Sequence, residues 1–201
     1  MHLSDQLIEL LFEWQPPERM REHVDVLAEM LGNDAMQRRG KPFREAWVAA
    51  RFARRTDQEE VRLLREEQYG TTPDFAVRSG NVARRYETTE ADVPGRKRQL
   101  EYRSPMPAGV EPMIMTSLDA MVEQMRLLTS RKAAKKYTDC AGLVVHLNPP
   151  MFSFNPAFRT ESMRLATEPA ANSFREVWLL RDKGVLLWLE GNFLGWVPDD
   201  F

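Results

Sequence analysis

The sequence predicts a mixed α/β fold, with a central sheet of about five or six strands flanked by helices. Three features indicate this fold: helical periodicity over the first fifty residues, an acid-rich hairpin over residues 74–93, and a buried strand followed by a β-meander after residue 139. A chain of 201 residues with 43% hydrophobic composition can bury one sizeable core. We therefore expect a single domain over residues 1–201.

Composition narrows the class of protein. The formal net charge is −2, so affinity for nucleic acid would have to come from a local patch of cations. Cys140 is the single cysteine, which rules out an intrachain disulfide and a zinc site built on cysteine pairs, and fits a reducing cytoplasm. No apolar run is long enough to cross a bilayer. We expect a cytoplasmic protein without a membrane anchor, and the sequence leaves its oligomeric state open, a homodimer included.

Two helices account for most of the first part of the chain. One begins at Pro17 and ends near Gly32, and a second runs from Pro42 to about Arg54 and carries Glu45. The first has apolar residues on a single face, namely Met20, Val24, Leu27 and Leu31. We interpret residues 1–40 as a helical N-terminal extension.

A hairpin follows these helices. The stretch EEVRLLREEQ before it fits a short strand, although Thr56 and Glu59 also match a helix capping box. Pro73 then opens an extended run over residues 74–78, residues 79–81 turn the chain, and residues 82–93 return as a second strand. The Pro94-Gly95 pair ends that strand.

The remainder reads as helix, strand and meander. A long helix begins at Thr116, with Leu118, Met121, Met125, Leu128 and Lys132 on one face, and CAGLVVHLN then fits a strand buried on both faces. The region of residues 149–201 is expected to be a loop, with room for a short helix, followed by a meander of EVWLLR, VLLWLEG and FLGWV. His146, Trp178, Trp188 and Trp196 are expected to pack in the core.

Acidic residues gather on the hairpin. Asp74, Glu87, Glu90 and Asp92 lie within nineteen positions, and alternation along a strand puts Glu90 and Asp92 on one face and Glu87 on the other. Such acids either form cross-strand pairs with neighbouring arginines or hold a metal ion.

The order of these elements resembles the core of the PD-(D/E)XK nuclease superfamily, the restriction-endonuclease-like fold. The resemblance covers residues 43–148 and rests on Pro73-Asp74 at the start of a strand, an acid-bearing strand after the turn, a long helix and a buried strand. It implies that Asp74 and Glu90 bind Mg²⁺ or Mn²⁺, with Glu87 as the fallback for Glu90 and Glu45 contributed by the upstream helix. In that family the metal activates water and neutralises charge on a phosphodiester.

This sequence departs from the family pattern at its lysine. Thr89 stands two residues after Glu87, and Asp92 stands two residues after Glu90, where a lysine is expected. Asp92 would then act as a third ligand, and the candidates for the missing cation are Lys97, Lys132 and Lys136. The last two share a face of the helix from Thr116, from which some members of the superfamily supply a displaced lysine. Phosphate contacts are expected from Arg96, Lys97, Arg98, Lys132 and Lys136.

Three functions follow from these observations. The first is a divalent-metal-dependent nuclease that hydrolyses phosphodiester bonds in DNA, or less readily in RNA. The second is a catalytically inactive module of the same fold that binds nucleic acid or protein, which the absent strand lysine favours. The third is an unrelated interaction protein that uses its N-terminal helices. The retained Pro73-Asp74 and the Glu90 and Asp92 pair favour the first.

Overall fold

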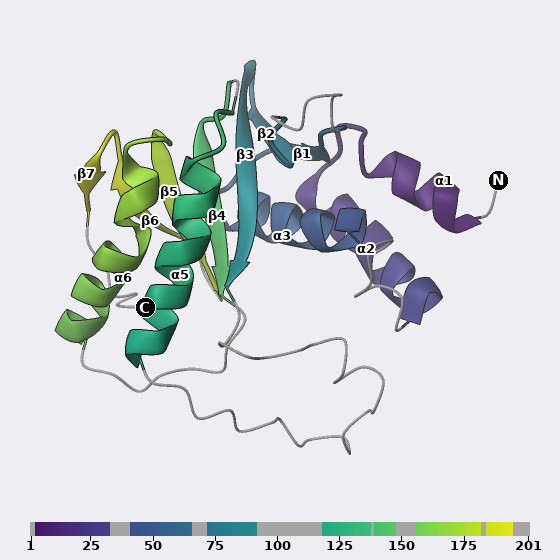
Figure 1. Ribbon diagram of the computed structural model, residues 1–201. Helices are drawn as coiled ribbons and strands as arrows, with labels where there is room; N and C mark the ends of the chain where they lie inside the picture. The colour runs from purple at the N-terminus through teal and green to yellow at the C-terminus, as the bar shows by residue number, and fades with distance from the viewer. Residues whose placement is uncertain are drawn as a thin grey trace. The chain divides into compact units, whose positions relative to one another are not determined.

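The computed structural model describes residues 3–32, 41–65, 72–91, 118–137, 139–147, 156–181 and 184–194. It confirms the mixed α/β fold (Figure 1). Within these residues seven strands, rather than five or six, follow one another in sheet order β1-β2-β3-β4-β5-β6-β7. The described residues fall into two compact units, of which the first comprises residues 3–32, 41–65 and 74–84, and the second the remainder. The single domain over residues 1–201 and its proposed core at 43–148 stay predictions.

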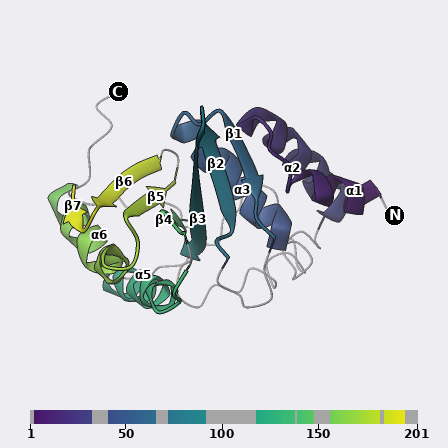
Figure 2. The same ribbon diagram turned by 90° about the horizontal axis from the view of Figure 1, so that it is seen from above.

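The described part of the first unit contains three helices and the start of the sheet. Its elements are α1 (Leu3–Leu10), α2 (Pro17–Leu31), α3 (Lys41–Arg55), β1 (Glu60–Leu63), β2 (Phe75–Ser79) and the first residues of β3 (Val82–Ala91). β1 and β2 pair antiparallel, which confirms the strand interpretation of EEVRLLREEQ. α3 packs on these two strands and also against α2 (Figures 1 and 2).

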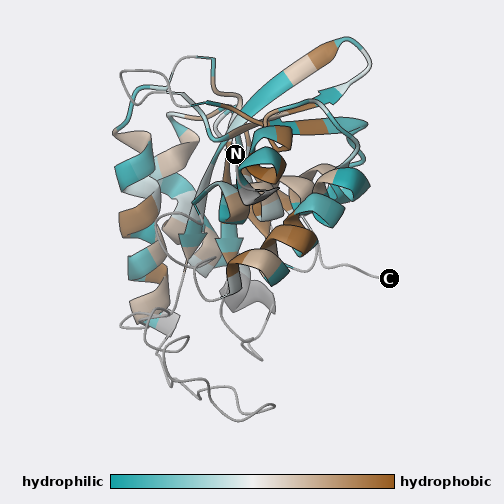
Figure 3. Ribbon diagram, turned by 90° about the vertical axis from the view of Figure 1, so that its right-hand side faces the viewer, coloured by the Kyte–Doolittle hydropathy of each residue, from teal (hydrophilic) through white to brown (hydrophobic). Residues whose placement is uncertain are grey.

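Helical periodicity explains the core of this unit. Met20, Val24 and Leu27 of α2 are buried, as predicted, and Gly32 ends the helix with a positive φ of 49°, a conformation that glycine adopts without strain. The buried face of α3 is largely alanine, which lets its backbone approach α2 closely. Figure 3 shows hydrophilic and hydrophobic residues alternating along the helices, as expected where one face is buried.

In the part of the second unit that the structure describes lie the remaining strands and two helices. Its elements are the rest of β3, α5 (Leu118–Ala133), β4 (Gly142–Leu147), α6 (Pro156–Ala171), β5 (Glu176–Leu180), β6 (Gly184–Leu189) and β7 (Asn192–Phe193). β4 runs parallel to both β3 and β5, which confirms the prediction of a buried strand inside the sheet. β5, β6 and β7 form the predicted antiparallel meander. α5 and α6 lie side by side on one face of these strands (Figures 1 and 2).

Two helices differ from the prediction. α6 has 16 residues, where a loop with a short helix was expected, because Met163, Ala166 and Ala170 give it an apolar face that packs in the core. The four prolines of this stretch obscured that face, although Pro156 occupies the first helical position, where proline is tolerated. α5 ends at Ala133, so Lys136 does not share a helix with Lys132.

Several single-residue expectations are confirmed. Met121 and Met125 of α5 are buried, and so is His146 in β4. Trp188 is buried and donates a hydrogen bond from Nε1 to Thr167 Oγ1 at 2.7 Å, whereas Trp178 is half-buried. Thr116, the expected cap of α5, and Trp196 lie outside the described residues. Within the described ranges no helix has the length and apolarity needed to cross a membrane.

Candidate functional site

Two of the predicted site residues meet in the first unit. Glu45 lies in the second turn of α3, and Asp74 directly precedes β2. The backbone carbonyl of Asp74 accepts a hydrogen bond from the N–H of Leu64 at 3.0 Å, which fixes the chain where β1 ends. The side chain of Glu45 is only 18% exposed, and its Oε1 lies 3.4 Å from Nζ of Lys41, one helical turn earlier. The two carboxyl groups are joined by a hydrogen bond.

Burial dominates the electrostatics of this carboxyl pair. It raises the pKa of Glu45 to about 8, and the negative charge of Asp74 acts in the same direction, while the ammonium group of Lys41 opposes both effects. Near neutral pH the Glu45 carboxyl is therefore protonated and donates its proton to the Asp74 carboxylate. Glu45 therefore keeps a proton that a solvated glutamate would release.

A divalent cation fits this donor set. The pair offers hard carboxylate oxygens, which Mg²⁺ and Mn²⁺ prefer. A bound cation would replace the proton of Glu45 and remove the repulsion between the two carboxylates. Mg²⁺ in proteins commonly takes one or two carboxylates and completes its shell with water and substrate phosphate. Among the described residues no group of three or more acids, histidines or cysteines is placed to hold a metal. Binding would therefore depend on the two carboxylates of Glu45 and Asp74 and on water.

The second unit holds another acidic residue in contact with a lysine. Glu87 of β3 is 4% exposed at its side chain, and its Oε1 forms an ion pair with Nζ of Lys132 of α5, which is 21% exposed. A buried ion pair of this kind joins the strand to the helix that covers it. Lys132 is thus held beside an acid of β3, and its roles as a displaced lysine and as a phosphate contact stay predictions.

Glu90 occupies the opposite side of β3 from Glu87. Residues two apart share a face, so Glu87 and Ala91 point alike, and Ala91 lies in the core cluster with Met125 of α5. Glu90 points to the other face, where the buried His146 stands next to it in the parallel pairing of β3 with β4. The contacts of Glu87 and Ala91 with α5 agree with alternation along β3, while the shared face of Glu90 and Asp92 stays a prediction because Asp92 lies outside the described residues. Whether Glu90 or Glu87 is the second metal ligand stays a prediction.

The remaining predicted residues divide into two groups. Asp92, Arg96, Lys97 and Arg98 lie outside the described residues. Lys136 is exposed in the segment after α5. Sequence reasoning missed Lys41 as the partner of Glu45, although the i, i+4 spacing of the two residues on a predicted helix was a usable signal.

Comparison with known proteins finds no matching family model, no similar curated protein and no similar solved structure. The resemblance to PD-(D/E)XK nucleases therefore rests on the residues and the order of elements described above.

Proposed function

We propose that this chain is a divalent-metal-dependent nuclease of PD-(D/E)XK type that hydrolyses phosphodiester bonds in DNA, and less readily in RNA, in the cytoplasm. One observation carries the proposal. Glu45, which the resemblance selects as a metal ligand together with Asp74, is largely buried and hydrogen-bonded to Asp74, and its pKa is raised to about 8. Perturbed carboxyl pairs of this kind are concentrated at functional sites.

The proposed roles follow from the chemistry of the side chains. Glu45 and Asp74 would hold Mg²⁺ or Mn²⁺, which when bound supplies an activated water and neutralises charge on the phosphate. Glu45 must release its proton before it can bind the cation. Lys41 lies at the exposed side of the pair, with 53% of its side chain exposed, so it can turn toward solvent once the cation binds.

A positive group beside the phosphate would complete the site. The sequence-based candidates for this group, Lys97 and Lys132, stay predictions. Removal of a lysine that acts only in the transition state should lower cleavage while metal affinity is retained.

The second candidate function is a catalytically inactive module that binds nucleic acid or protein. Thr89 favours it, because this residue stands where the family pattern places a lysine after Glu87. The ion pair between Glu87 and Lys132 would then serve stability alone.

A cleavage assay separates these two functions. Single- and double-stranded DNA and RNA are incubated with the full chain and Mg²⁺ or Mn²⁺, beside Asp74→Asn, Glu45→Gln and the control Glu29→Gln, which alters an exposed acid on α2. The nuclease proposal predicts cleavage by the wild type and the control, and a loss of about a hundredfold or more in the two site variants. Absence of wild-type cleavage on all four substrates with both metals would leave the inactive module as the better account.

A further inference from the structure

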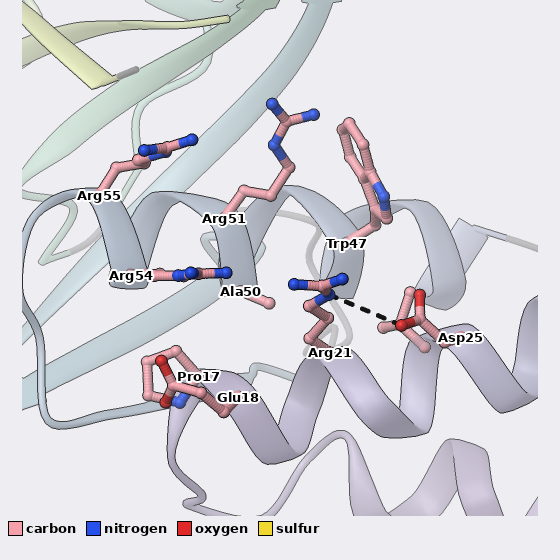
Figure 4. A pocket seen from close by; sticks show the side chains of 10 residues that line it. Pro17, Glu18, Arg21, Asp25, Trp47, Ala50, Arg51, Arg54 and Arg55 are labelled. Atoms are coloured by element: carbon pink, nitrogen blue, oxygen red, sulfur yellow. Dashed lines mark ion pairs between the residues drawn. The ribbon is translucent and has the colours of Figure 1, made fainter. Parts of the chain in front are cut away.

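A second site lies in the first unit, between α2 and α3. A pocket of about 310 Å³ opens between these helices, a volume at the lower end of the range for small-molecule sites. Figure 4 shows Arg51, Arg54 and Arg55 projecting from α3, and Arg21 from α2. Four arginines and two acids, Glu18 and Asp25, line the pocket and leave it with a net charge of +2. We call it the arginine pocket.

The arginines differ in how their charge is compensated. Arg21 forms an ion pair with Asp25 at 3.6 Å, and both side chains are 62% exposed, so this pair is weak and readily exchanged for another anion. The guanidinium of Arg51 lies 4.5 Å from the ring centre of Trp47, which orients it over the aromatic face. Arg54 and Arg55 have no side-chain ion pair or hydrogen bond within the ranges that the structure describes. Within the described residues, the charges of Arg54 and Arg55 are therefore not compensated by a side-chain partner.

Helix stability explains only part of this arrangement. Arg54 and Arg55 occupy the last turn of α3, where cations interact favourably with the helix dipole. That interaction requires no pocket and places no demand on Arg21 or Arg51. The spacing of Arg51, Arg54 and Arg55 at i, i+3 and i+4 puts all three on one face, toward the pocket that Arg21 lines from α2. Like charges at this spacing repel one another unless an anion lies between them.

We infer that the arginine pocket binds a phosphate monoester, the group carried by nucleotides and by the phosphorylated ends of nucleic acid strands. A phosphate monoester carries a charge near −2 at neutral pH, which balances the net charge of the pocket. Guanidinium groups bind phosphate oxygens through paired, planar hydrogen bonds, which lysines cannot form. The volume admits a phosphate with its attached sugar. The site uses only residues of α2 and α3 and does not depend on the metal site.

The test measures binding by the full chain in EDTA at low salt, so that metal-dependent cleavage cannot contribute. Calorimetry is performed with inorganic phosphate, adenosine 5′-monophosphate and adenosine, and fluorescence anisotropy with an oligonucleotide carrying a 5′-phosphate or a 5′-hydroxyl group. The test variant is Arg54→Gln/Arg55→Gln. Its matched control is Arg126→Gln/Arg131→Gln, which removes the same charge from exposed positions of α5. Asp74→Asn is included to keep the metal site separate.

We expect the monophosphate to bind and adenosine not to bind, with affinity reduced at least about tenfold in Arg54→Gln/Arg55→Gln and unchanged in the control and in Asp74→Asn. Tighter binding of the 5′-phosphorylated strand than of the mononucleotide identifies a strand end as the source of the phosphate, and equal binding identifies a nucleotide. Absence of binding at about 1 mM to any phosphate monoester overturns the inference. So does an equal loss of affinity in the control, or equal binding of strands with and without the 5′-phosphate.

Discussion

The raised pKa of Glu45 predicts how stability changes with pH. The folded state holds the Glu45 proton up to a pKa of about 8, whereas the ordinary value is 4.5. Between these two values the folded state binds more protons than the unfolded state, so the free energy of unfolding falls as the pH rises. Glu45→Gln keeps a neutral, hydrogen-bonding side chain beside Asp74 at every pH. The variant should therefore lose this part of the pH dependence.

The size of the effect follows from the pKa difference. A change from 4.5 to about 8 corresponds to about 5 kcal/mol between pH 4 and pH 9. This is an upper limit, because Lys41 can move closer to the charged pair and offset part of the repulsion. We expect the wild type to lose a few kcal/mol over this range relative to Glu45→Gln, with the variant the more stable protein at pH 9.

Urea unfolding at half-unit pH steps measures this difference. Glu29→Gln serves as the control, because it removes an exposed carboxylate from α2 and should follow the wild type. At pH 9, addition of Mn²⁺ at a hundred times its dissociation constant should restore about 2.7 kcal/mol to the wild type and little to Glu45→Gln. If the free energy of unfolding changed with pH in the same way for wild type and Glu45→Gln, the argument that Glu45 is protonated in the folded state would be refuted.

Two further predictions concern the second unit. Met125→Asp places an unpaired charge in the core and should lower the free energy of unfolding by several kcal/mol, whereas Leu127→Asp, at a position that is 44% exposed on the same helix, should change it by less than about 1 kcal/mol. Equal melting temperatures for these two variants would show that the buried face of α5 is misassigned. Glu87→Gln and Lys132→Met should each destabilise by about 3–5 kcal/mol, because each leaves a poorly solvated charge without its partner. The double variant should cost less than the sum of the two single variants, and strict additivity in urea unfolding would argue against a direct pair.

Periodicity and turn residues predicted much of the fold. The apolar faces of α2 and α5, the hairpin at Gly80, and the continuous apolar run of β4 each have one strong local signal, and the structure confirms all four. The length of α6 was underestimated because its prolines suggested a loop with a short helix, while its apolar face is evident only from its packing with α5.

The candidate site was less accessible to sequence reasoning. The resemblance selected Asp74 and Glu90 together with Glu45 from the upstream helix, but no local pattern shows that Glu45 and Asp74 are hydrogen-bonded. Lys132 was selected because some members of the superfamily supply a displaced lysine from this helix, whereas its contact with Glu87 joins residues 45 positions apart. Such pairings depend on tertiary packing, which periodicity alone does not specify.

The arginine pocket could be predicted from the sequence only in part. Arg51, Arg54 and Arg55 fall on one face of α3 by spacing alone, but the sequence gives no sign that Arg21 lies across from them. The arginines at the end of the helix predicted from Pro42 to about Arg54 were therefore assigned no role.

The central claim, that Glu45 and Asp74 bind a divalent cation in place of the proton of Glu45, is tested most directly by calorimetric titration of Mn²⁺ at pH 7. The titration is repeated in two buffers that differ in ionisation enthalpy, which reports the number of protons released. We predict that wild-type protein binds Mn²⁺ with release of about one proton, because Glu45 is protonated before binding, and that Asp74→Asn fails to bind. Equal Mn²⁺ affinity in wild type and Asp74→Asn, or binding without proton release, would contradict the claim.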